Sequence, residues 1–307
     1  MQPSGTAGLD GVATAVAAAL GAAVGAAAAR RLSAWLPQSA REPWERINHA
    51  GRPVTLLEGP VWITGALTGL VAARATVPRR RRGDGARGWA HVAGLLVAGG
   101  ALGALDDLVG TASSKGLKGH LGALRRGQVT TGAIKVAGLA ATGLASAFVA
   151  DRTKRGCTAD PSTSRRATVR PSQGVLGTLV GGGVVAGAAN AVNLFDLRPG
   201  RALKVVVLSA APLAVLGSAP AGAGLGASLV ALGDDLAGTS MLGDTGANAA
   251  GALVGLALVE ATGLRGRVVA LACLAALTLA SERVSFTQVI EAHDGLRRLD
   301  EWGRVRP

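Results

Sequence analysis

Two adjacent carboxylates, Asp106 and Asp107, close an apolar, glycine-rich run that begins at Ala98. Two further aspartates, Asp196 and Asp244, lie in the segments NAVNLFDLRPG and MLGDTGAN. Basic residues accompany them at Lys115, Lys118, Arg198, Arg201 and Lys204. Carboxylates and lysines together suit a magnesium ion that holds a phosphorylated substrate, because Mg²⁺ takes one or two protein carboxylates and fills its other positions with phosphate oxygens and water.

The paired aspartates are not expected to bind the same ion. Neighbouring residues on a helix point about 100° apart, so one carboxylate would face the metal and the other a second substrate. A simpler interpretation also applies to each motif alone, since carboxylates at the end of a membrane span are often only solvated and basic loops often only anchor lipid headgroups. Four such motifs favour a site. Asp234 and Asp235 are expected to flank the MLGD loop rather than to form a site of their own.

The elements that must position these residues are apolar runs along the whole chain. Of 307 residues, 49% are hydrophobic and 46 are glycine, and the mean hydropathy is +0.37, which indicates a polytopic membrane protein. We predict an all-α transmembrane helix bundle of about nine to ten spans in residues 1–281, followed by a polar C-terminal tail, 282–307. The predicted spans are 9–29, 56–73, 88–105, 132–150, 174–192, 203–217, 219–233, 247–263 and 266–281. Residues 203–232 could form one kinked helix, but Pro220 in GSAPAGAG favours a turn.

Nine spans place the motif loops on one face. The loops after the first, third, fifth, seventh and ninth spans share a side, and every motif falls in one of them. Lysine and arginine are slightly more frequent on this side, which favours a multi-pass protein of the cytoplasmic membrane with the motif loops in the cytoplasm. The net charge of +13 does not indicate nucleic acid, because the basic residues lie in short segments between apolar runs and aromatic residues make up only 3%.

In their order and spacing, GALDD, SKGLKGH, NAVNLFD and MLGDTGAN resemble the motifs of the polyprenyl-phosphate N-acetylhexosamine-1-phosphate transferase family, which includes the phospho-N-acetylmuramoyl-pentapeptide transferases. The resemblance covers about residues 48–248. It implies a bundle of about ten transmembrane helices with a cytoplasmic site. It also implies a phosphoglycosyltransferase that moves a sugar 1-phosphate from a UDP-N-acetylhexosamine to polyprenyl phosphate, uses Mg²⁺ and releases UMP.

The resemblance also implies roles for single residues. Asp244 would bind the metal, and Asp106 and Asp107 would lie near the lipid phosphate and the metal, with Asp107 as the second metal ligand. The expected substrate-binding residues are Lys115, Lys118, Asn190, Asn193, Asp196 and Arg52. The chain departs from the family pattern at Pro199, which stands where a second aspartate is usual, at Gly110, which replaces a lysine, and in lacking a histidine-rich loop. These departures affect recognition of the nucleotide and sugar more than metal binding.

Two other functions stay open. A family member could bind the lipid carrier without turnover, and an ion-coupled membrane transporter would also carry charged residues in a glycine-rich bundle. Against a transporter, the acidic residues lie at span ends rather than at the bilayer midplane. The expected partners are polyprenyl phosphate, a UDP-sugar and the membrane, not nucleic acid, and a homodimer is left open.

Overall fold

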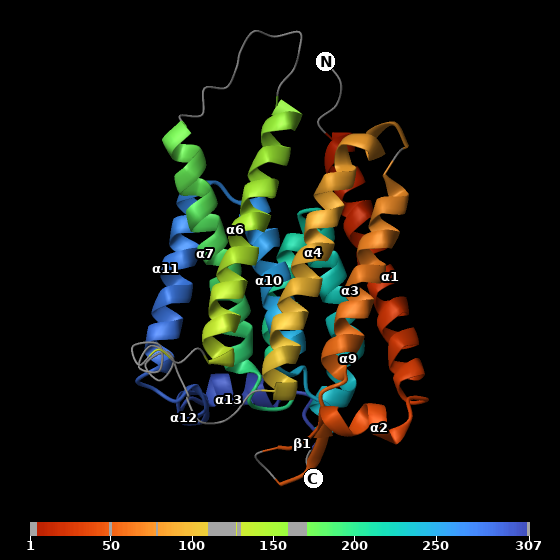
Figure 1. The fold of residues 1–307 in the computed structure, drawn as a ribbon, viewed down its shortest axis with the longest axis vertical. Coiled ribbons are helices and arrows are strands. Elements are labelled where there is room, and N and C mark those ends of the chain that lie inside the picture. The colour runs from red at the N-terminus through yellow and green to blue at the C-terminus, as the bar shows by residue number, and fades with distance from the viewer. Residues whose placement is uncertain are drawn as a thin grey trace.

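The protein is a bundle of long helices that run roughly parallel to one axis, as the computed structural model shows (Figure 1). The structure describes residues 5–48, 51–77, 79–109, 127, 130–158 and 171–305. Within these ranges the long helices are α1 (Gly5–Ser33), α3 (Glu58–Thr76), α4 (Arg79–Val109), α6 (Thr131–Thr158), α7 (Pro171–Phe195), α8 (Arg201–Val215), α9 (Ala219–Leu236), α10 (Gly243–Ala261) and α11 (Leu264–Ser281). The predicted all-α class is confirmed.

Each predicted apolar run corresponds to one of these helices, but not all of them qualify as membrane spans by composition. Five are long and apolar enough to cross a bilayer, namely α1, α4, α6, α7 and α11. α8 has 15 residues, fewer than the roughly 20 that a span usually needs. A membrane protein is therefore supported, whereas the count of nine to ten spans is not established.

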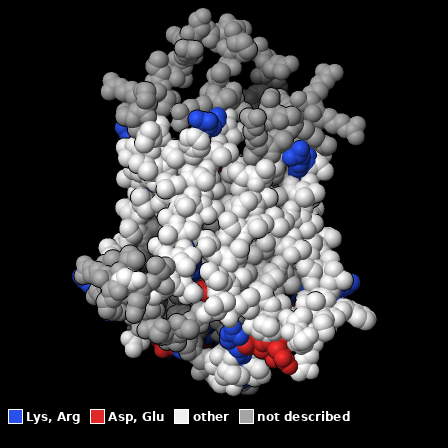
Figure 2. All heavy atoms as spheres, in the orientation of Figure 1, with Lys and Arg blue, Asp and Glu red and all other residues white. Residues whose placement is uncertain are grey.

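The surface has the charge distribution of a membrane-embedded bundle. Figure 2 shows a broad uncharged belt around the middle of the visible face, with lysine and arginine towards both ends and aspartate and glutamate towards the lower end. Many large apolar side chains on the outer helices are exposed, among them Leu20, Val24 and Val71, each more than 60% accessible. Such an area of exposed apolar side chains is expected where lipid, not water, surrounds the protein.

The interior is built from small residues, which let helix backbones approach closely. α10 lies at the centre and packs against α3, α4, α6, α7, α8 and α9. Its middle turns, GANAAGALVGLAL (246–258), are almost entirely buried. At Gly226 in α9, an added Cβ would come within 2.0 Å of the backbone oxygen of Ala19 in α1. Only glycine allows α1 and α9 to lie this close.

The predicted turn between the sixth and seventh apolar runs is confirmed. α8 ends at Val215, Gly217 takes a φ of 90°, and α9 begins at Ala219. The Ser218 hydroxyl accepts a hydrogen bond from the backbone N–H of Ala221 at 3.4 Å and so caps α9. Pro220 occupies the first turn of the helix, where its missing N–H costs nothing.

Short elements that the sequence did not predict cover the end of the bundle that carries the motifs. Between α1 and α3 lie α2 (Gln38–Arg41), the 3-10 helix η1 (Glu42–Trp44) and an antiparallel hairpin of β1 (Glu45–Ile47) and β2 (Pro53–Thr55). The predicted polar tail contains α12 (Phe286–Ala292) and α13 (Asp294–Glu301). The hairpin segment and the two tail helices lie at the lower end of the bundle in Figure 1.

Candidate functional site

The C-terminal end of α4 meets the N-terminal end of α10, and this contact brings the aspartates of two motifs together. Gly103 makes the approach possible, because a Cβ at this position would lie 2.1 Å from the backbone oxygen of Asp244. Asp106 and Asp107 follow Gly103 by about one turn of α4. Residues 137 positions apart in the chain, Asp107 and Asp244, are thus in direct contact.

A lysine bridges two of the aspartates in this contact, Asp106 and Asp244. The Nζ of Lys135, in the second turn of α6, is 2.7 Å from Oδ2 of Asp106 and 2.5 Å from Oδ2 of Asp244. The Thr131 hydroxyl donates a hydrogen bond of 2.9 Å to the other oxygen of Asp106. The three charged side chains are between 15% and 23% exposed. Two carboxylates therefore converge on one cation.

Lys135 is not among the site residues predicted from the sequence. Its position was a usable signal, since it is a lone lysine near the start of an otherwise apolar run, 132–150. An ionisable residue inside a membrane span is a functional candidate by default, with its partner to be named. The partner could not be named because the packing of α6 against α4 and α10 is not readable from the sequence.

Asp107 has a different environment from Asp106. Its carboxylate accepts hydrogen bonds from the backbone N–H of Asp244 at 3.0 Å, the N–H of Thr245 at 2.9 Å and the Thr245 hydroxyl at 2.6 Å. These N–H groups belong to the first turn of α10. The N–H groups of a first turn have no hydrogen-bond acceptor within their own helix. Asp107 thus caps α10 from a neighbouring helix, where a negative charge also suits the helix dipole. The guanidinium of Arg46 donates to the backbone oxygen of Asp107.

Three further acidic residues are buried beside this group, at Glu58, Asp196 and Asp235, each less than 9% exposed. The Ser240 hydroxyl donates to one oxygen of Glu58, while the other oxygen of Glu58 has no hydrogen-bond partner among the residues that the structure describes. Burial raises the pKa of Asp196 well above its usual value, and the charges of Asp235 and Asp244 raise it further. Asp196 is one of the site residues predicted from the sequence, whereas Glu58 is not.

The remaining predicted substrate residues are dispersed. The side-chain amide of Asn190 donates to the Thr278 hydroxyl of α11 at 3.0 Å, so it joins two helices. Asn193 is partly buried near the end of α7, and Arg52 is exposed at the hairpin with its guanidinium beside Gly238. Lys115 and Lys118 lie outside the residues that the structure describes.

The basic residues after α7 hold the C-terminal segment instead of standing free for a phosphate. Arg201 forms two hydrogen bonds with the Asp300 carboxylate, at 2.7 and 3.0 Å. Lys204 donates to the backbone oxygens of Leu299 and Asp300, at 3.0 and 2.6 Å. Arg198 lies 3.4 Å from Glu291. In the sequence these three residues were noted only as cations that accompany the aspartates; in the structure α12 and α13 fold back onto them.

Within the described ranges, no three histidine, cysteine, aspartate or glutamate side chains are arranged to hold a metal ion. The carboxylates of Asp106 and Asp244, which both contact the ammonium of Lys135, are the pair of acidic groups that lie on one cation. Comparison with protein-family models, with curated proteins and with solved structures finds no match. The geometry of the site and the motifs of the sequence therefore carry the functional argument.

Proposed function

We propose that the protein is a divergent, Mg²⁺-dependent phosphoglycosyltransferase that moves a sugar 1-phosphate from a UDP-N-acetylhexosamine to polyprenyl phosphate and releases UMP. The observation that carries this proposal is the convergence of Asp106 and Asp244 on the ammonium of Lys135 at one end of an apolar bundle. A reaction between a lipid and a polar nucleotide requires charged groups at such a place, where a membrane surface meets water.

The electrostatic problem of the reaction matches the charges that are present. A phosphate monoester has a second pKa near 6 and is largely dianionic at neutral pH, so the acceptor needs little help from a base. Bringing it to a diphosphate requires neutralisation of repelling charges, and phosphoryl transfer depends mainly on positioning and electrostatics. Lys135 supplies one positive charge at the site, and the two carboxylates provide the means to hold another.

The donor set fits Mg²⁺, since this ion takes one or two carboxylates and prefers oxygen ligands. Asp106 and Asp244 already place one oxygen each against a single cation, Lys135. We assign the metal to this pair rather than to Asp107 with Asp244, because the Asp107 carboxylate accepts three hydrogen bonds from the start of α10. When bound, Mg²⁺ would neutralise phosphate oxygens of the nucleotide. Asp107 would act by holding Asp244 in position.

The setting follows from the same proposal. The nine long helices would cross the cytoplasmic membrane, with the largely buried α10 at the centre of the bundle. The end with Asp106 and Asp244 would face the cytoplasm, where nucleotide sugars are available. Asp196, near Asp244, would help to shape the nucleotide side of the site.

The test is UMP release by the full-length protein in lipid nanodiscs with undecaprenyl phosphate and Mg²⁺. A panel of UDP-N-acetylhexosamines and the muramoyl-pentapeptide nucleotide would serve as donors, and chelation would remove the metal. Asp244→Asn should abolish release, whereas Asp294→Asn, an exposed carboxylate paired with Arg297, should leave it unchanged. Activity that survives Asp244→Asn contradicts the proposal. A folded protein that binds the lipid but releases no UMP from any donor would be a carrier-lipid binder without turnover.

A further inference from the structure

The apolar outer face of α1 ends in a tryptophan that the rest of the protein hardly covers. Leu20, Val24 and Leu32 are each more than 60% exposed, and their spacing places them on one face of this helix. Trp35 follows two residues after the end of α1 and is 86% exposed. The indole therefore lies where the apolar outer surface of α1 stops.

The chain becomes polar directly after Trp35 and its neighbour Leu36. Four of the ten residues from 37 to 46 are charged. Arg31 and Arg41 flank the apolar pair, both are exposed, and neither pairs with a carboxylate of a residue that the structure describes. A long arginine side chain can lie along apolar surface and keep its guanidinium in a polar layer. An indole at such a boundary is typical of the membrane–water interface, where tryptophan is enriched.

A second exposed tryptophan lies at the same end of the bundle. Trp302, which follows α13, is 72% exposed. The end of α9 relates the two positions. Arg30 of α1 lies 2.9 Å from Asp234, and the backbone N–H of Val305 donates to the last residue of α9 at 3.1 Å. Trp35 and Trp302 are thus each a few residues from a contact with the same helix end.

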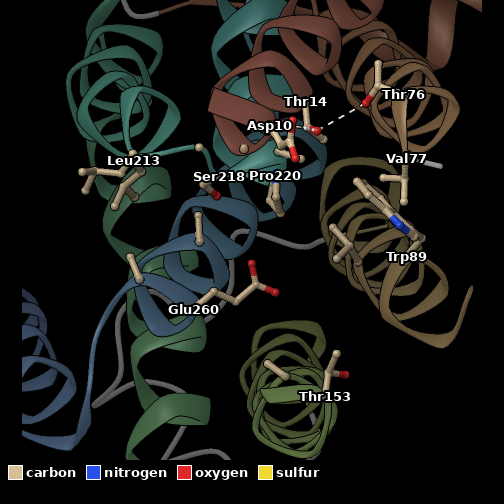
Figure 3. Close-up of a pocket in the computed structure, with 18 of the residues that line it drawn as sticks. Asp10, Thr14, Thr76, Val77, Trp89, Thr153, Leu213, Ser218, Pro220 and Glu260 are labelled. Atoms are coloured by element: carbon tan, nitrogen blue, oxygen red, sulfur yellow. Dashed lines mark hydrogen bonds between the residues drawn. The ribbon is translucent and has the colours of Figure 1, made fainter. Parts of the chain in front are cut away.

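The opposite end of the bundle has its tryptophan in a different setting. The five tryptophans all lie in described ranges, and Trp35 and Trp302 are the two that are exposed. Trp89 is partly buried and faces inward, beside a cavity of about 850 Å³ that Asp10 and Glu260 also line (Figure 3). Exposed indoles therefore mark the aspartate end.

The segment that follows Trp35 is hydrogen-bonded to the loop that precedes Asp244. The backbone N–H of Thr55, at the end of β2, donates to the oxygen of Thr239 at 3.2 Å, and the oxygen of Thr55 accepts from the N–H of Met241 at 3.0 Å. Whatever holds this segment in place also fixes the level of the aspartate site.

We propose that the residues from Arg31 to Arg41 form an anchor that rests in the interface of a phospholipid bilayer. Trp35 and Leu36 would lie between acyl chains and headgroups, and the two guanidinium groups would contact phosphate oxygens. Trp302 would lie at the same level on the tail. Lipid is the occupant that the surface favours, because the patch continues the apolar face of α1, which lipid covers wherever the bundle crosses a membrane. The anchor does not depend on the transferase reaction.

Tryptophan fluorescence tests the anchor in nanodiscs whose lipids carry bromine either near the headgroup end of the acyl chain or near its middle. Bromine quenches an indole only at close range. We expect shallow bromine to quench part of the emission, Trp35→Phe to lose part of this quenched intensity, and Trp35→Phe with Trp302→Phe to lose more. The intensity quenched by mid-chain bromine should stay the same. Unchanged shallow quenching in Trp35→Phe would overturn the proposal and leave the patch to a protein partner.

A second measurement uses a neighbouring position as its matched control. In a background without Cys157 and Cys273, a nitroxide on Leu36→Cys should collide more with oxygen, which concentrates in lipid. A nitroxide on Ser39→Cys, exposed in α2, should collide more with a water-soluble nickel complex. Equal access of the nickel complex to both labels would contradict the anchor. UMP release is measured separately, so either proposal can fail while the other stands.

Discussion

At the scale of single residues, the site depends on which of two neighbouring aspartates does which task. Asp106 and Asp107 are adjacent, yet one faces Lys135 and the other faces the backbone of α10. The angle between neighbouring side chains on a helix makes this division necessary. Their different partners lead to different expectations for the same substitution at the two positions.

Replacing Lys135 with methionine should destabilise the protein, because it leaves the carboxylates of Asp106 and Asp244 facing each other without a cation. Removing one partner of a buried ion pair usually costs 3–5 kcal/mol, and with this partial exposure we expect about 2–3 kcal/mol. Unfolding of the purified protein in detergent measures the change. Adding Asp106→Asn to Lys135→Met should restore part of the stability by removing the repulsion, and a further loss in the double variant would contradict the bridging role.

Asp107 should tolerate asparagine better than alanine. Asparagine can still accept a hydrogen bond from the α10 N–H groups, and the two residues cap helices about equally well, whereas loss of a cap to alanine costs about 1 kcal/mol. The unfolding free energies of Asp107→Asn and Asp107→Ala test this order. A metal ligand would show the other behaviour, in which both substitutions weaken Mg²⁺-dependent UMP release alike.

At the scale of elements, the helices predicted from the sequence agree with the structure where hydrophobicity alone determines their position. Each apolar run from 9–29 to 266–281 lies within a helix or extends past its end by at most two residues, because a run of this length in lipid buries its backbone only as a helix, and Pro220 marks the turn between α8 and α9. Partners of charged side chains were less predictable. Arg201 was noted only as a cation that accompanies the aspartates, and its partner Asp300 was not predicted, because nothing local in the sequence reveals that the tail folds back over nearly 100 residues.

The docking of α13 should depend on ionised Asp300. Burial opposes ionisation, but Arg201 and Arg304 outweigh it and lower the pKa of Asp300 from its usual value of 3.8. Because the folded state has the lower pKa, docking is fully stabilised above about pH 4 and is lost as the pH falls through the lowered value. Hydrogen exchange of residues 294–301, corrected for the intrinsic effect of pH, should show this release.

The same contact can be tested at neutral pH. Asp300→Asn mimics protonation and should speed tryptic cleavage after Arg297 and Arg298, both on α13. The matched control is Asp294→Asn, which removes an exposed pair with Arg297 and should change the cleavage rate little. Equal rates in the Asp300→Asn variant and the unchanged protein would show that Arg201 does not hold the tail through this carboxylate.

Helix packing gives a paired prediction within α9. Gly226→Ala should destabilise the bundle, because its Cβ would lie 2.0 Å from the backbone oxygen of Ala19. Gly233→Ala meets nothing within 4 Å and should raise the unfolding free energy by roughly 0.5–1 kcal/mol, the usual gain in helix propensity. The unfolding free energies of both purified variants in detergent measure the difference. Destabilisation of equal size at both positions would mean that flexibility, not close approach, is what these glycines provide.

At the scale of the whole molecule, the two ends of the bundle carry different chemistry. One end combines aspartates, Lys135 and the folded-back tail, and the other holds the cavity with Asp10 and Glu260. The uncharged belt in Figure 2 separates them. The described chain begins near the cavity end and finishes near the aspartate end (Figure 1). A bundle that crosses the membrane as one unit must therefore have these two ends on opposite sides.

Cysteine labelling tests both this arrangement and its direction. In a background without Cys157 and Cys273, we expect Ser39→Cys, exposed in α2, to react with a membrane-impermeant maleimide only in inverted vesicles. Gly263→Cys, exposed between α10 and α11, should react only in right-side-out vesicles. Labelling of both from one side would contradict a single membrane-crossing bundle. The reverse pattern would keep the bundle but place Asp106 and Asp244 outside the cell, away from cytoplasmic nucleotide sugars, and would thus remove the basis for the transferase.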